Sequence, residues 1–201
     1  RFTLAILAGQ GRDVKLAEKR VEGYKAFCNK LWNAVKYFHL QVDAAGASFV
    51  EPKEGALSWL RHHQPELLPV NRWILSRLQT VIQDVERGLE NFEINVASQS
   101  LYDFAWGEFC DWYIELTKQI FKGEQKDEKN DQYETLVTFH FVLDQLLSLL
   151  HPFIPFVTEE LWQSLPWKKS ATTTARQQKN LQPLQTLSLQ SFPELHSHFK
   201  D

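Results

Sequence analysis

The chain has little cysteine, no methionine and no long apolar run. Cys28 and Cys110 are its two cysteines, too few and too far apart for a disulfide framework or a CxxC metal site. Because reduced thiols are typical of intracellular proteins, we expect a cytoplasmic protein. No apolar run reaches the roughly 18 residues that a membrane-spanning helix needs, and no signal peptide opens the sequence. We therefore expect no membrane partner.

Motifs that carry enzyme chemistry are also missing from the 201 residues. The sequence contains no glycine-rich phosphate loop, no HExxH pair and no nucleophile elbow. His62 and His63 are adjacent in a segment that we interpret as a connector, which is weak evidence for a metal site. The sequence therefore predicts no catalytic residue, no metal ligand and no cofactor in this chain.

Apolar residues at helical spacing predict an all-α fold. They mark five long segments, which are residues 14–17 to about 41, 72–89, 93–121, 133–150 and 155–165. Five long helices with short connections favour a helical bundle. A helix end covers residues 2–8, and "SWLRHHQPELLP" reads as a connector with one short turn. Because the chain opens without Met and in the middle of a helix, we expect a piece of a longer polypeptide.

The end of the chain differs in composition from the bundle. Residues 167–201 begin with a polar, Thr- and Gln-rich stretch that is typical of a flexible tail. A short β-like stretch near residue 187 is too short to define a sheet. We accordingly divide the chain into residues 1–13, which end a preceding region, a bundle over 14–166, and a polar, partly flexible tail over 167–201.

The first long helix has a polar side of unusual composition. Lysines, an amide and an aromatic ring fall within about 60° of one another on a helical wheel, at Lys19, Lys30, Asn33 and Tyr37. Lys36 lies on the shoulder of this stripe. Single-stranded RNA is bound by cations that hold phosphates and by rings or amides that meet bases. The stripe therefore predicts an RNA-binding surface, provided that Lys30 and Tyr37 project together into open solvent. A solvated helix face, or a docking face for an acidic protein, would give the same pattern.

The longest predicted helix carries an acidic edge beside an apolar band that includes Trp112 and Leu116. In a regular α-helix, Glu108 and Glu115 are two turns apart, about 10 Å along the axis, and Asp111 lies on the adjacent flank. This separation does not suit paired acid–base catalysis. A carboxylate can instead accept a hydrogen bond from the amino group of cytosine. A solvated edge, or carboxylates paired with lysines of the bundle, are the alternatives.

Three segments, in this order and spacing, closely resemble the anticodon-binding domain of valyl-tRNA synthetase. They are "GRDVKLAEKRVEGYKAFCNKLWNA", "WGEFCDWYIELTK" and "LDQLLSLLHPFIPFVTEELWQSLP". The resemblance covers about residues 1–166. "FCNKLWNA" together with "EFCDWYIE" looks specific to the valine enzymes, whereas "HPFIPFVTEELW" is shared in looser form with isoleucyl- and leucyl-tRNA synthetases. The opening "RFTLAILAGQGRD" resembles the stretch just after the KMSKS loop of the family.

The resemblance implies the helical bundle of the class Ia synthetases and a role in tRNA binding. The parent enzyme activates valine with ATP and Mg²⁺ and attaches it to its tRNA, and it has a separate editing domain. Neither HIGH nor KMSKS occurs in this sequence, so the chain alone is expected to be catalytically inactive. Its expected partners are the anticodon loop and the rest of the synthetase chain, and residues 1–13 would end the region that contacts the tRNA stem.

The resemblance also implies a set of contact residues. The anticodon contacts of the family fall, position by position, on Lys19, Lys30, Lys36, Tyr37, Ile114 and Glu115. The three lysines would hold phosphates, a base would stack on Tyr37, and the last two residues would contact bases from the facing helix. The alternatives are the equivalent domain of an isoleucyl- or leucyl-tRNA synthetase, and a non-catalytic helical scaffold that docks an acidic protein.

Overall fold

The computed structural model describes residues 1–9, 18–123, 128–166 and 186–200, and the regular elements of these residues are all helical. The main helices are α2 (Glu18–Ala45), α4 (Pro69–Glu90), α5 (Ile94–Asp103), α6 (Ile114–Phe121), α7 (Glu128–Leu150) and α8 (Pro155–Ser164). A π-helix, η3 (Phe104–Tyr113), joins α5 to α6 without a break. Two further α-helices are α1 (Phe2–Leu7) and α3 (Ala56–His63). The predicted all-α bundle is confirmed.

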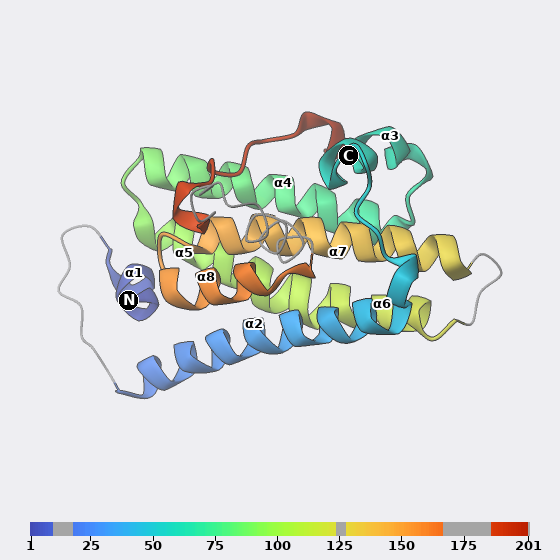
Figure 1. Cartoon of the computed structure of the whole chain (residues 1–201). Helices are drawn as coiled ribbons and strands as arrows, with labels where there is room; N and C mark the ends of the chain where they lie inside the picture. The colour runs from blue at the N-terminus through green and yellow to red at the C-terminus, as the bar shows by residue number, and fades with distance from the viewer. Residues whose placement is uncertain (10–17, 124–127, 167–185, 201) are drawn as a thin grey trace, which may run out of the picture.

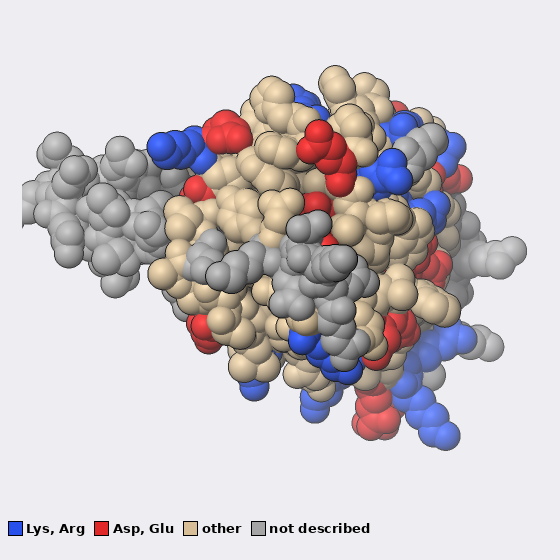
Figure 2. All heavy atoms as spheres, turned by 90° about the vertical axis from the view of Figure 1, so that its right-hand side faces the viewer, with Lys and Arg blue, Asp and Glu red and all other residues tan. Residues whose placement is uncertain are grey.

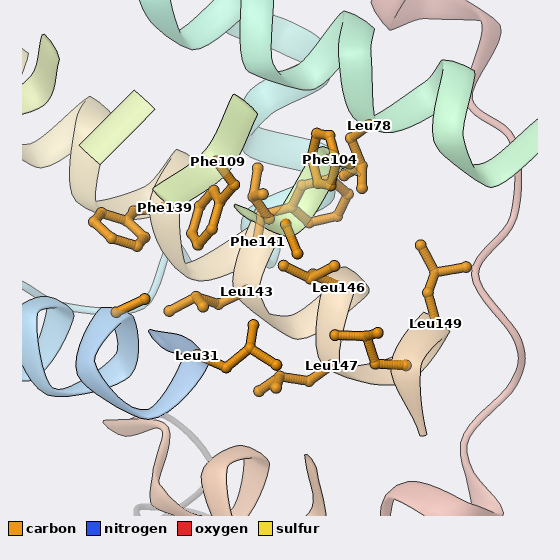
Figure 3. Packing of buried hydrophobic residues seen from close by; sticks show 14 of the residues in the cluster. Leu31, Leu78, Phe104, Phe109, Phe139, Phe141, Leu143, Leu146, Leu147 and Leu149 are labelled. Atoms are coloured by element: carbon orange, nitrogen blue, oxygen red, sulfur yellow. The ribbon is translucent and has the colours of Figure 1, made fainter. Parts of the chain in front are cut away.

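Helix α7 forms the centre of the bundle. In Figure 1 it runs between α2 on one side and α4 on the other, and it packs against both. Every residue from 134 to 143 is buried, because neighbouring helices enclose this part of α7. The buried residues include polar side chains, among them Glu134, Thr135 and Thr138. Its side chains meet Leu31 of α2, Leu78 of α4, and Phe104 and Phe109 of η3 (Figure 3). The core therefore fixes α2 and η3 relative to each other.

The segment that we expected to be a connector contains a helix, α3. Leu60 is fully buried, and Trp59 stacks on His63 with 4.2 Å between ring centroids. The His63 ring donates from Nδ1 to the Trp59 carbonyl across 2.8 Å. The helix follows Gly55, whose φ of 81° suits glycine. The prediction was wrong because an eight-residue helix offers too few apolar positions for a clear period.

Two other boundaries differ from the prediction by four residues or more. Helix α2 extends four residues beyond position 41, to Ala45, and its predicted start lies at residues outside the described part. Helix α7 begins at Glu128 rather than at Tyr133. Its first turn is polar, so the apolar period gives no signal there, but Glu, Lys and Gln are strong helix formers.

The last described segment, residues 186–200, lies along the outside of the bundle (Figure 1). Leu187 and Phe199 are buried in short 3₁₀ turns, η4 (Leu187–Leu189) and η5 (Ser197–Phe199). The backbone N–H of His196 donates to Gln79 of α4 across 2.6 Å. The expected β-like stretch near residue 187 is therefore a turn that packs on helices. Residues 167–185 lie outside the described part, and the division into three regions stays a prediction.

Candidate nucleic-acid interface

The polar residues of α2 divide into two groups in the structure. Lys19, Asn33 and Lys36 are exposed to solvent. Lys30 and Tyr37 are half-buried and contact the neighbouring run η3–α6 instead. The expectation that Lys30 and Tyr37 project together into open solvent was wrong. They close the seam between α2 and the run η3–α6, whereas the other three groups face solvent.

Lys30 has two partners on η3. Its ammonium forms an ion pair with Asp111 and lies 4.1 Å from the centroid of the Trp106 ring. A cation over an indole face is attracted by the negative face of the ring. The Lys30 side chain is 26% exposed and that of Asp111 49%, so the pair remains accessible from solvent. An ammonium has three N–H donors, and a donor of Lys30 remains for a third group.

Tyr37 closes the seam about two turns further along α2. Its ring lies 6.4 Å from that of Phe121 and 6.3 Å from that of Phe139, measured between centroids. Burial raises the pKa of Tyr37, and the nearby charge of Glu115 raises it further. The phenol is therefore neutral at pH 7 and can donate a hydrogen bond. Phe121 meets the Tyr37 ring edge-on and Phe139 meets it at a tilt, so Tyr37 is more enclosed than the predicted stacking surface required.

The orientation of α2 explains these corrections. Its buried side is formed by Phe27, Leu31, Ala34, Val35 and Phe38. The centre of this arc is rotated by roughly 40° on a helical wheel from the direction that we predicted. Val21, which we had placed on the apolar side, is exposed. The rotation brings Lys30 and Tyr37 to the edge of the contact with η3 and α6.

The acidic edge predicted on the longest helix does not exist as one surface. Glu108 accepts two hydrogen bonds from Arg77 of α4, at 2.6 and 2.8 Å, whereas Asp111 pairs with Lys30 of α2. Glu115 is exposed and pairs with Lys118. The cause is η3, because a π-helix bonds residue i to i+5 and has more residues per turn than an α-helix. Seven residues no longer make two turns, so the carboxylates separate.

A buried polar network holds the inner side of η3. Tyr113 donates from its hydroxyl to the Asn71 side-chain oxygen across 2.9 Å, and Asn71 donates from Nδ2 to Glu134 across 2.7 Å. The backbone N–H of Leu68 also donates to Glu134, across 2.6 Å. Burial raises the pKa of Glu134 in spite of these bonds. The network links η3 to α4 and α7, and it fixes the backbone next to the seam.

The residues that follow the network lie at the surface of the same run. Ile114 is 9% exposed and belongs to the core, so it supports the surface from beneath. Glu115 is exposed. Trp112 is 64% and Leu116 49% exposed, although helical spacing had assigned both to an apolar band. The helical wheel assumed an α-helix throughout this run. The sequence gives no sign of the π-helix, so the exposure of these two side chains was not predicted.

Other reactive groups do not form a site in the described residues. Burial raises the pKa of the Cys110 thiol to about 12, and burial also raises the pKa of Cys28, so both thiols are protonated at neutral pH. Within the described ranges, no three His, Cys, Asp or Glu side chains are placed to hold a metal ion. The same ranges hold no helix long and apolar enough to cross a membrane.

Comparison with known proteins gives the family of the chain. Residues 71–200 match the anticodon-binding domain of tRNA ligase. The chain is 41% identical over 174 residues to the valine–tRNA ligase of Aquifex aeolicus, which covers 83% of the chain and 14% of that relative. It is 43% identical over 176 residues to that of Thermotoga maritima, covering 88% and 18%, and 40% identical over 194 residues to that of Xanthomonas campestris pv. campestris, covering 96% and 18%. The chain thus spans less than a fifth of the length of these relatives. The family resemblance is confirmed, and the chain belongs to the anticodon-binding domains of tRNA ligases.

Proposed function

We propose that this chain binds the anticodon loop of tRNA as part of a cytoplasmic valine–tRNA ligase. The observation that carries the proposal is the family match over residues 71–200, together with relatives that are valine–tRNA ligases. These relatives favour the valine enzyme over the isoleucyl and leucyl alternatives. Activation of valine with ATP and Mg²⁺, and its transfer to tRNA, would belong to the catalytic region of the parent enzyme. The catalytic and editing domains would be the partners of this chain within the same polypeptide.

The surface beside the seam between α2 and η3–α6 suits a single-stranded loop. Lys19 and Lys36 are exposed cations for phosphates, and Asn33 and Glu115 offer an amide and a carboxylate to base edges. From Lys30 to Tyr37 the seam extends about 10 Å along α2, which accommodates a few unstacked nucleotides. Lys30 would add its remaining donor at one end and the Tyr37 hydroxyl would add one at the other.

Local groups rather than a basic face would then recognise the RNA. The formal net charge of the chain is −3. At the end of the bundle where α2 finishes, Lys and Arg side chains are interspersed with Asp and Glu (Figure 2). Sequence-independent affinity comes from neutralised phosphates. A surface of mixed charge neutralises few phosphates, and it therefore favours a small number of specific contacts.

The test is the affinity of the purified chain for two RNA hairpins that share a stem and differ in the anticodon. We expect tighter binding of the hairpin with the valine anticodon. Replacing both Lys19 and Lys36 with Ala should weaken binding of either hairpin. The slope of log affinity against log salt concentration should become less steep by about two. Lys53→Ala, which removes an exposed cation on a different segment, is the matched control. Equal affinity for the two hairpins would contradict anticodon recognition.

A further inference from the structure

The indole of Trp112 is the most exposed tryptophan side chain among the large exposed apolar residues of the described part, at 64%. Tryptophan is usually buried over most of its surface. Leu116, four residues later and one turn further along the same face, is also exposed. The two side chains make an apolar area on the outer face of η3–α6 that the core does not use.

The neighbours of Trp112 place this area beside the seam. Asp111, directly before it, pairs with Lys30. Phe121, further along the same run, packs against Tyr37 with 6.4 Å between ring centroids, and the charge of Glu115 contributes to the raised pKa of the Tyr37 phenol. Trp112 therefore lies, along the helix axis, between the two points where η3–α6 meets α2. The indole stands at the solvent side of the surface that the proposed function uses.

The exposure of Trp112 is imposed by the residues on either side. Asp111 is held toward α2 by Lys30, and Tyr113 is held inward by its hydrogen bond to Asn71. Phe109 stacks under Tyr113 in the core, with 5.8 Å between centroids. With the backbone fixed in both directions, the side chain between them points outward. A π-helix is rare and is often found at functional sites, which agrees with a use for this outward ring.

We propose that Trp112 stacks against an unpaired base of the bound RNA loop, with Leu116 extending the apolar floor. The inference rests on the proposed function. Every base has a flat π face, so an exposed ring binds bases with little regard to their identity. The adjoining carboxylates, Asp111 and Glu115, each have a lysine partner, so they repel the RNA backbone less than free carboxylates would. Trp112 thus supplies affinity, and the seam supplies discrimination between anticodons.

The experiment compares three variants of one side chain for binding of the hairpin with the valine anticodon. Trp112→Ala should weaken binding by about five- to hundredfold, the effect of losing one stacked base. Trp112→Phe keeps an aromatic face and should restore most of the affinity, whereas Trp112→Leu keeps apolar area without a ring and should not. The salt dependence should be the same in all three variants, because no phosphate contact is removed. Phe156→Ala, which removes an 83% exposed ring from α8, is the matched control and should bind normally.

The possible results separate the inference from the proposed function. If the unaltered chain binds neither hairpin, the proposed function fails and the inference fails with it. If the unaltered chain binds and Trp112→Ala binds equally well, the stacking role is overturned while anticodon binding stands. Full affinity of Trp112→Leu, with weak binding of Trp112→Ala, would overturn stacking in favour of a plain apolar contact. Thermal unfolding of each variant, expected to match that of the unaltered chain, confirms that only the surface has changed.

Discussion

The inner and outer sides of η3 use neighbouring residues for different purposes. On the inner side, Phe109 and Tyr113 are fully buried, and the Tyr113 hydroxyl joins a network that reaches α4 and α7. On the outer side, Asp111 and Trp112 are exposed. The first side determines where the helix lies, and the second offers groups that nothing in the core requires. Stability and binding are therefore expected to respond to different substitutions.

This separation depends on the π-helix. In an α-helix, one stripe of residues would face the core and the remaining positions would follow in regular order. The wider π turn sends Glu108 to α4 and Asp111 to α2. One short segment thus holds two neighbouring helices while it exposes an indole between them. A substitution on one side should leave the other side largely unaffected.

The largest expected effect comes from removing a buried aromatic ring on the inner side of η3. Phe109→Ala should lower the free energy of unfolding by about 4 kcal/mol, because a buried ring is lost and a cavity remains. The Phe109 ring packs 5.2 Å from that of Phe139 on α7, measured between centroids. Urea denaturation followed by circular dichroism measures the change. Trp112→Ala in the same assay should differ from the unaltered chain by less than about 0.5 kcal/mol, and equal losses for the two variants would contradict the comparison.

Much of the fold could be predicted from local spacing, but the seam could not. The apolar positions of α2 and α7 repeat at helical intervals, and the predicted bundle is correct because burial follows that period. Lys30 and Asp111 are 81 residues apart, and no local pattern pairs them. On a helical wheel, a polar residue is also predicted to face solvent. A lysine or tyrosine at the edge of a helix contact can nevertheless bury its stem or ring and keep its polar end in solvent. The exposure of Trp112 was missed because nothing in its neighbourhood distinguishes a π-helix from an α-helix.

The network on the inner side should give stability an unusual dependence on pH. The pKa of Glu134 is raised above its ordinary value of 4.5, chiefly by burial. A carboxyl group with a raised folded-state pKa contributes stability below its unfolded pKa, and that contribution is lost as the pH rises through the folded pKa. Glu134→Gln keeps an oxygen for the N–H groups of Leu68 and Asn71 but cannot ionise. We therefore expect the stability of the unaltered chain, relative to this variant, to fall as the pH rises above 4.5 toward neutrality. Urea titrations of both proteins across this range measure it, and a difference that is constant with pH would contradict an ionising buried carboxyl.

The smallest effect is expected at the seam itself. Asp111→Asn removes the charge partner of Lys30, but the pair is partly exposed, so we expect a loss of about 0.5 kcal/mol in the free energy of unfolding. The loss should shrink as salt is added, because salt screens exposed charges. Glu115→Gln, which removes the charge partner of Lys118 on the same run, is a control of similar size. A loss of several kcal/mol for Asp111→Asn would mean that Lys30 stabilises the fold, as the residues on the inner side of η3 do. In that case the surface left for RNA would be the exposed residues of α2 and the Trp112 face, without the lysine between them.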